Sequence, residues 1–215
     1  MVKRTVIIAG ASGMVGREIL AGLLADDRVA EVHSLGRKPP TVQHPKLRAY
    51  IVDFASLRLP VLPQADEVYL ALGTTIKVAG SQEAFRAIDY DANLAVARAA
   101  QAAGVKKLGL VSAMGADANS SVFYNRVKGE LEDALEKMAF DGLVIARPSL
   151  LVGDRKVLGQ SERRGEKIGL AVSKLIGFLI PANYQPIEAT AVARALLKTA
   201  PQAQGKTILL SGAMH

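Results

Sequence analysis

The chain has 215 residues, half of them hydrophobic, which suits one domain with a substantial core. It contains no cysteine, which excludes a disulfide framework, thiol catalysis and thiolate metal sites, and its three scattered histidines show no metal-ligand spacing. The net charge of +7 suits a phosphate-bearing partner. Because the basic residues are dispersed and not interleaved with aromatic residues, we expect a phosphorylated small molecule rather than a nucleic acid. No secretory signal is recognisable at the start, so we expect a cytoplasmic location.

An apolar run at residues 5–9 leads into three spaced glycines and then into a helical pattern. This order predicts a strand, a phosphate-binding turn and a first helix. Gly10 allows the tight turn, Gly13 lets the backbone approach a pyrophosphate, and Gly16 lets the helix pack closely on the strand. A purely structural strand-turn-helix is the alternative, but the context favours nucleotide binding. The expected cofactor contacts in this turn are Gly10, Ser12, Gly13, Met14, Val15 and Gly16.

The second predicted strand, residues 29–36, ends in Gly36-Arg37-Lys38 without a carboxylate. In dinucleotide-binding units an acidic residue near this position binds the ribose 2′-hydroxyl, whereas an arginine accommodates a 2′-phosphate. The sequence therefore favours NADP(H) over NAD(H), with Arg37 as a bidentate phosphate ligand. The competing interpretation is an exposed basic turn before Pro39.

Two further predicted strands, residues 47–52 and 67–73, also end at the edge where such cofactors lie. After the first, Asp53 either accepts from the adenine amino group, with Phe54 lining the adenine pocket, or caps the following turn. We leave both roles open. After the second, Leu72, Gly73 and Thr74 are expected at the ribose or nicotinamide side. Residues 77–82 are expected to form a loop that bends at Gly80.

A helix is predicted from about residue 83 to residue 103, with Gly104 as a left-handed cap and Asn93 as a structural hydrogen-bonding residue. The strand at 107–112 then delivers Ser112 to the same sheet edge. In the helix predicted at 123–135, Tyr124 and Lys128 are four residues apart and share a face. A neighbouring ammonium favours the phenolate and brings the tyrosine pKa closer to neutrality.

These three side chains suit hydride transfer between a carbonyl and an alcohol. Ser112 would polarise the carbonyl, Tyr124 would donate or remove the proton, and Lys128 would also hold the nicotinamide ribose. By itself, a tyrosine and a lysine at this spacing often form only a solvated helix face. The position of the pair after the fifth strand of a dinucleotide fold favours a catalytic role.

The glycine turn, the strand-end Ser112, the Tyr124-x-x-x-Lys128 pair and residues 146–149 together resemble the short-chain dehydrogenase/reductase superfamily. Within it, Gly36-Arg37 and the segments 111–116 and 124–130 are similar to the atypical NAD(P)H-binding proteins related to TIP-thirty. Segment 184–196 is similar to epimerase-like relatives. The resemblance covers nearly the whole chain. It implies an NADP(H)-binding Rossmann domain with Ser112, Tyr124 and Lys128 as the catalytic triad.

Further strands are expected at 142–147 and 207–210, with Arg147 more suited to a structural ion pair than to a substrate contact. The expected fold is α/β, a doubly wound and mainly parallel Rossmann sheet. It would form a single domain over residues 1–215, with a small C-terminal substrate-side segment at about 153–185. The apolar stretch 168–180 contains Lys174 and is too short to span a bilayer.

The function expected from the sequence is that of an NADP(H)-dependent oxidoreductase acting on a small-molecule carbonyl or alcohol. A redox sensor or scaffold protein that binds NADPH without catalysis is the alternative. An epimerase, or a flavin or tetrapyrrole reductase on the same fold, is a third reading. A homo-oligomer or a protein partner is compatible with any of the three.

Overall fold

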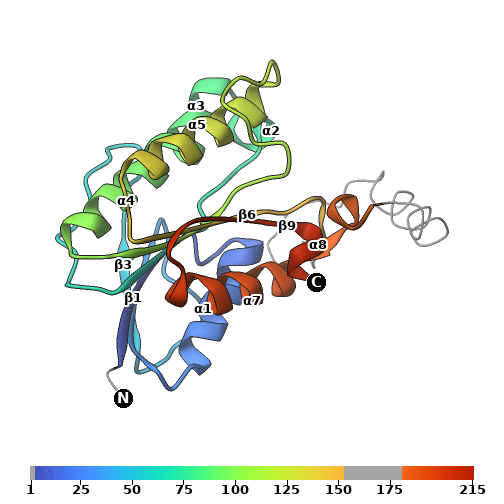
Figure 1. Cartoon of the computed structure of the whole chain (residues 1–215). Coiled ribbons are helices and arrows are strands. Elements are labelled where there is room, and N and C mark those ends of the chain that lie inside the picture. The colour runs from blue at the N-terminus through green and yellow to red at the C-terminus, as the bar shows by residue number, and fades with distance from the viewer. Residues whose placement is uncertain (1–2, 153–180) are drawn as a thin grey trace.

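A seven-stranded parallel sheet forms the centre of the protein in the computed structural model, which describes residues 3–152 and 181–215 (Figure 1). The spatial order of the strands is β3-β2-β1-β4-β5-β6-β9, and every neighbouring pair runs parallel. The strands are β1 Arg4–Ala9, β2 Val29–Gly36, β3 Leu47–Ile51, β4 Glu67–Leu70, β5 Lys107–Val111, β6 Gly142–Arg147 and β9 Gly205–Leu210. The predicted α/β fold with a doubly wound sheet is confirmed.

The strand order reverses between β1 and β4. From β1 the chain proceeds outward through β2 to β3, and from β4 it proceeds in the opposite direction to β9. Ligands of open α/β sheets bind at such a switch point, beyond the carboxyl ends of the strands. The glycine turn that follows β1 and the loop that follows β4 lie on the two sides of this point.

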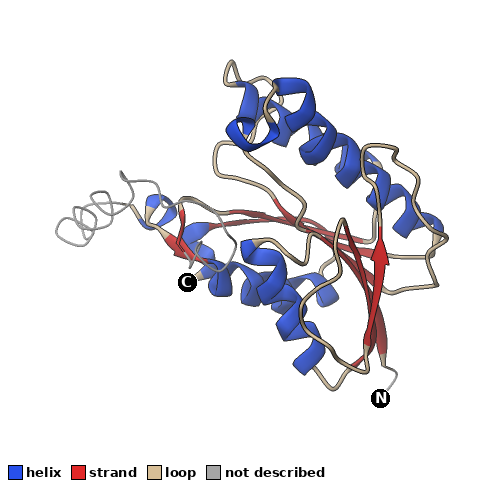
Figure 2. Cartoon of the chain, turned by 180° about the vertical axis from the view of Figure 1, so that it is seen from behind, coloured by secondary structure: helices blue, strands red, loops and turns tan. Residues whose placement is uncertain are grey.

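Helices cover both faces of the sheet, as the two opposite views show (Figures 1 and 2). On one face lie α1 and α7, and on the other lie α4 and α5. The helical segments are α1 Met14–Ala25, α2 Ile76–Ala79, α3 Gln82–Arg86, the π-helix η1 Ala87–Ala92, α4 Asn93–Ala102, α5 Phe123–Lys137, η4 Ala182–Tyr184, α7 Ala189–Thr199, η5 Ala200–Gln202 and α8 Ser211–Met214. A short parallel pair, β7 Leu151–Val152 and β8 Ile187–Glu188, lies apart from the main sheet.

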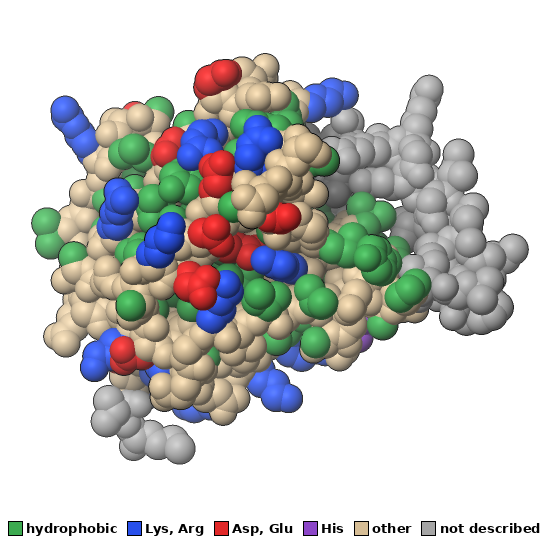
Figure 3. Space-filling view, turned by 45° about the horizontal axis from the view of Figure 1, so that its top comes forward, with side chains coloured by type: hydrophobic (Ala, Val, Ile, Leu, Met, Phe, Trp, Pro, Cys, Tyr) green, Lys and Arg blue, Asp and Glu red, His purple; other side chains and the backbone are tan. Residues whose placement is uncertain are grey.

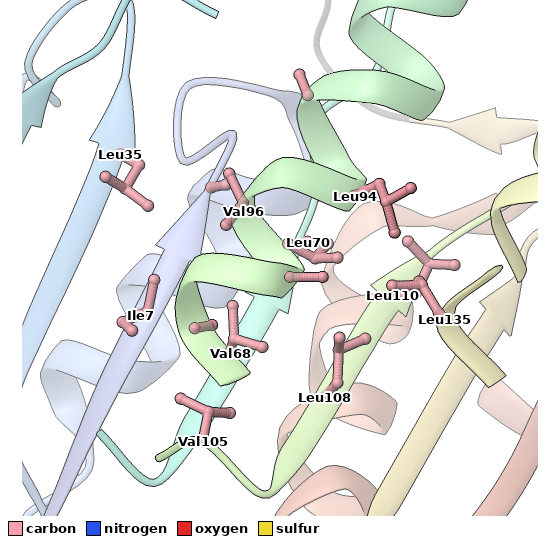
Figure 4. Packing of buried hydrophobic residues seen from close by; sticks show 14 of the residues in the cluster. Ile7, Leu35, Val68, Leu70, Leu94, Val96, Val105, Leu108, Leu110 and Leu135 are labelled. Atoms are coloured by element: carbon pink, nitrogen blue, oxygen red, sulfur yellow. The ribbon is translucent and has the colours of Figure 1, made fainter. Parts of the chain in front are cut away.

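Alternate residues of the buried strands supply two separate hydrophobic cores. In β1, Val6 and Ile8 pack in the cluster that contains residues of α1 and α7, whereas Ile7 packs in the cluster below α4 and α5. Figure 4 shows the second cluster, in which Leu94 of α4 approaches Leu110 of β5. Side chains along a strand point to opposite faces, so a near-continuous apolar run is what a sheet covered on both faces requires.

The segment between β4 and β5 differs most from the sequence-based expectation. The predicted loop at 77–82 overlaps the short helix α2, which begins after a side-chain cap from Thr75 and ends before Gly80, whose φ is +91°. The single helix expected at 83–103 is instead α3, η1 and α4 in succession. A π-helical turn adds a residue to the helical repeat and is frequent at functional sites.

Residues 153–180, which include most of the expected substrate-side segment and the apolar stretch 168–180, lie outside the described residues. The prediction of one domain over residues 1–215 stays a prediction. Among the helices in the described ranges, none has the length and apolar character needed to cross a membrane. On the face seen in Figure 3, acidic and basic side chains are interspersed, so this face carries no uniform basic field.

Candidate nucleotide and catalytic site

The turn after β1 has the geometry expected of a dinucleotide-binding turn. Gly10 has a φ of +89°, and a Cβ there would lie 2.4 Å from the Ala71 carbonyl oxygen. A Cβ on Gly16 would lie 2.0 Å from the Gly10 carbonyl oxygen. The protein's own packing therefore requires glycine at both positions. At Gly13 the nearest atom would be 3.4 Å away, an ordinary contact, so packing alone does not demand glycine there.

Helix α1 begins at this turn without a capping side chain. Its N-cap residue is Gly13, no side chain within residues 3–152 and 181–215 caps it, and its first turn holds no acidic residue. Ser12 is exposed, Met14 is half-buried and Val15 is buried. Open N–H groups and the positive end of a helix dipole favour a negatively charged ligand. These residues fit the diphosphate of a dinucleotide.

The residues predicted for the adenosine end have different surroundings. Arg37 is exposed and forms no hydrogen bond or ion pair with another described residue, so its guanidinium is available to a ligand. Asp53 Oδ1 accepts from the Ala55 N–H at 3.0 Å, which is the turn-capping role left open above. Phe54 is buried in the core cluster of Figure 4. Cofactor contacts of all three residues stay predictions.

The loop after β4 is fixed by two buried side chains from the next helical segment. Asn93 Nδ2 donates to the Leu72 carbonyl at 3.2 Å, and the Thr74 N–H donates to Asp89 Oδ2 at 2.9 Å. Asn93 therefore has the structural role expected from the sequence. A Cβ on Gly73 would lie 3.9 Å from Lys128 Nζ, so this loop and the predicted catalytic lysine are neighbours.

Lys128 is buried on α5 and forms an ion pair with the fully buried Asp89, with 2.7 Å between Nζ and Oδ1. Burial acts to lower the pKa of Lys128, but the charge of Asp89, with a smaller contribution from Tyr124, outweighs it and raises that pKa. Lys128 thus keeps its positive charge inside the protein.

Tyr124 lies one turn before Lys128 on the same helix and is half-buried. Its ring packs against the buried Phe85 with 5.4 Å between ring centroids. The Tyr124 hydroxyl has no hydrogen-bond partner within residues 3–152 and 181–215, so this hydroxyl is free to meet a ligand. The structure therefore provides a phenol and a buried ammonium on one face of α5.

Ser112 follows β5 directly and is held by a second buried carboxylate. Its hydroxyl donates to Glu132 Oε1, and Arg147 Nη2 lies 2.5 Å from Glu132 Oε2. The structural ion pair expected for Arg147 is therefore present. A Cβ on Gly129 would lie 2.2 Å from the Ala118 N atom, so the loop after Ser112 lies directly on α5.

Two carboxylates of the candidate site, Asp89 and Glu132, were not predicted from the sequence. Glu132 lies one turn after Lys128 and two turns after Tyr124, so the three share one stripe of α5. This helical spacing could have identified it. Asp89 lies four residues before Asn93. Two polar side chains at this spacing in an otherwise apolar helix were the feature of the sequence that could have pointed to Asp89.

A comparison with known families matches residues 10–173 to a family described as NAD(P)H-binding. The chain belongs to this NAD(P)H-binding family. The mitochondrial protein fmp52 of Aspergillus niger is 36% identical over 180 residues, which cover 80% of this chain and 75% of that protein. FMP52 of Candida albicans, also named mitochondrial, is 33% identical over 229 residues, covering 95% and 93%.

Solved structures place this member of the NAD(P)H-binding family in a wider fold group. A short-chain dehydrogenase family protein from Francisella tularensis has a TM-score of 0.71 at 11% identity and covers 98% of each chain. The Bordetella bronchiseptica enzyme WbmG in complex with NAD has a TM-score of 0.68 at 15% identity, covering 98% of this chain and 73% of its own. The resemblance to short-chain dehydrogenase/reductase proteins is confirmed at the level of the fold, and the family match confirms membership of an NAD(P)H-binding family.

One expectation from the sequence is wrong. A cytoplasmic location was inferred because no secretory signal and no cysteine were found. The fungal relatives of this NAD(P)H-binding protein are named mitochondrial proteins, which contradicts that inference. The absence of a secretory signal does not distinguish the cytosol from an organelle that is reached by another route.

Proposed function

We propose that the protein is an NADP(H)-dependent oxidoreductase that interconverts a carbonyl and an alcohol. The observation that carries this proposal is the placement of Lys128. Lys128 lies one helical turn after Tyr124 on α5, and the Tyr124 hydroxyl has no partner among the described residues. The buried Lys128 ammonium lies beside Gly73, at the edge of the sheet where a dinucleotide binds. When bound, the nicotinamide would supply or accept the hydride.

Tyr124 is proposed to exchange a proton with the substrate oxygen. Asp89 keeps Lys128 charged, and Phe85 limits the movement of the Tyr124 ring. The phenol would therefore be held in position before a substrate binds.

Ser112 is proposed to bind the substrate oxygen. Because its one hydroxyl hydrogen is donated to Glu132, the lone pairs of Oγ remain free to accept. In this arrangement Ser112 suits the hydroxyl of an alcohol. To donate to a carbonyl it would have to turn away from Glu132.

NADP(H) rather than NAD(H) is proposed because of the end of β2. Arg37 and Lys38 are exposed there, in the place where a carboxylate would bind a ribose 2′-hydroxyl. A guanidinium that has no partner among the described residues suits a 2′-phosphate, to which it can donate two parallel hydrogen bonds.

The experiment that tests the proposal follows the nicotinamide fluorescence of NADPH after it is mixed with the protein. A panel of aldehydes, ketones and quinones is then added, with Tyr124→Phe beside the wild type. We expect a saturable change on mixing in both proteins, followed by a decay only in the wild type. A saturable change with no decay across the panel would instead support the NADPH sensor or scaffold, and decay that survives in Tyr124→Phe would refute the role of Tyr124.

The names of the fungal relatives make mitochondria the compartment that we propose for this protein. Fractionation of cells that express the full chain, with detection of the protein in the mitochondrial fraction, tests this location. Recovery in the soluble cytosolic fraction alone would contradict it.

A further inference from the structure

We propose that Asp89 is a positioning residue of the site. Its carboxylate contacts both the Lys128 ammonium and the Thr74 backbone, and holds these two groups in the positions that bind the cofactor. This inference rests on the proposed function, since it assigns Asp89 to the binding of the nicotinamide ribose by Lys128. Neither the glycine turn nor the Ser-Tyr-Lys pattern includes this residue.

The two oxygens of Asp89 have different partners. Oδ1 lies 2.7 Å from Lys128 Nζ, and Oδ2 accepts from the Thr74 N–H at 2.9 Å. One partner belongs to α5 and the other to the loop after β4. Because a carboxylate is planar and rigid, these two contacts fix the distance between the lysine and the loop.

The backbone around Asp89 is built to hold it. Asp89 is fully buried in the π-helical turn η1, and Asn93 donates to the Asp89 carbonyl at 3.1 Å and to the Leu72 carbonyl at 3.2 Å. Asn93, the first residue of α4, thus holds the loop at Leu72, and Asp89 of η1 holds it at Thr74. In a regular α-helix, which has fewer residues per turn, different residues of the segment 87–92 would face α5.

Stability alone does not explain a buried pair of this kind. The cost of desolvating two charges often equals or exceeds their attraction, so an apolar pair of similar volume would serve the fold as well. The pair does, however, give Lys128 a fixed position and a retained charge. The other titratable groups that influence Lys128 are Tyr124 and Glu132, both on its own helix, so Asp89 is the carboxylate that reaches it from the facing element.

The test compares the wild type, Asp89→Asn and the double variant Asp89→Asn/Lys128→Met by fluorescence titration with NADPH from pH 5 to pH 9. Asparagine keeps the acceptor for Thr74 and removes the charge. The double variant leaves no unpaired charge buried, so it is expected to fold. Glu130→Gln is the matched control. The Arg86–Glu130 ion pair joins α3, the helix directly before η1, to α5, but this pair is partly exposed.

At pH 8 we expect Asp89→Asn to bind NADPH about tenfold more weakly than the wild type. Its affinity should lie within about threefold of that of the double variant, because a Lys128 side chain that is no longer held in position contributes little to NADPH binding. The affinity of Asp89→Asn should fall as the pH rises through the range of the titration, because a buried ammonium without a counter-charge loses its proton at lower pH. The wild type and the double variant should show no such fall, and Glu130→Gln should bind as the wild type does. This pH dependence separates positioning through Lys128 from a merely structural role.

Wild-type affinity in Asp89→Asn, beside weak binding in the double variant, would overturn the inference and leave the proposed function intact. A loss in Asp89→Asn that does not vary with pH would also overturn it. Wild-type affinity in the double variant would refute the contact between Lys128 and the cofactor in the proposed function, and the role of Asp89 with it. If Asp89→Asn does not fold, Asp89→Glu takes its place: its added methylene displaces Lys128, so weakened NADPH binding is expected and wild-type affinity would contradict the inference.

Discussion

Arg147 and Glu132 form an ion pair behind Ser112, with Arg147 Nη2 lying 2.5 Å from Glu132 Oε2. The carboxylate is almost completely buried, whereas the Arg147 side chain is 25% exposed. Glu132 also accepts from the Ser112 hydroxyl. The charge of a strand-end arginine therefore stabilises the carboxylate that sets the direction of the serine hydroxyl.

Glu132→Gln should lower the free energy of unfolding by about 1 to 3 kcal/mol, because it leaves the Arg147 guanidinium partly buried without a counter-charge. Urea unfolding measures the change. Glu136→Gln is the control on the same helix, since its ion pair with Lys206 is largely exposed and should contribute no more than about 1 kcal/mol. Equal losses in the two variants would show that burial of the Glu132 pair has no energetic consequence.

Gly16→Ala should lower the free energy of unfolding by about 2 to 3 kcal/mol, because its Cβ would overlap the Gly10 carbonyl and force the backbone apart. Gly13→Ala makes only ordinary contacts and should cost about 0.5 kcal/mol as a poorer N-cap. It should nevertheless weaken NADPH binding by roughly tenfold or more, since a methyl group there obstructs a pyrophosphate. Thermal unfolding and NADPH titration of both variants check the contrast. Unchanged affinity in Gly13→Ala would contradict the assignment of this turn to the phosphates.

The elements that the sequence predicts well are those whose signals are local. The run from β1 through the glycines into α1 carries its strand, turn and helix patterns within a few residues of one another, and the structure has all three. The helix α2 was missed because it has only four residues, and such short helices depend on their caps, here Thr75 and Gly80.

The contacts within the candidate site were predicted only in part, for a physical reason. Tyr124, Lys128 and Glu132 repeat every four residues on one helix, so a single sequence can reveal that they share a face. The pair of Asp89 and Lys128 joins two distant helical segments, and its alignment depends on a π-helical turn that helical periodicity does not show. Contacts between distant elements need the tertiary structure.

His33 should titrate below its ordinary pKa near 6.5, because burial disfavours the charged ring more than Glu31 favours it. A folded-state pKa below the unfolded value means that the neutral ring stabilises the fold above the unfolded pKa, and that this contribution is lost as the pH falls through the folded pKa. NMR titration of the ring protons, with His33→Gln to assign the signal, measures the midpoint. A midpoint at or above 6.5 would show that Glu31, not burial, dominates.

Arg37→Ala should weaken NADPH binding by about tenfold to a hundredfold, because a charge-assisted hydrogen bond to phosphate contributes about 1.5 to 3 kcal/mol. NADH lacks the 2′-phosphate, so its affinity should change by less than about twofold. Arg98→Ala removes the same charge from an exposed position on α4. It controls for the effect of the protein's overall positive charge on cofactor binding. Fluorescence titrations of the three proteins with both cofactors give the ratio of affinities. Equal losses of NADPH and NADH in Arg37→Ala would mean that Arg37 serves the fold or the common part of the dinucleotide, and the preference for NADP(H) would then need another ligand.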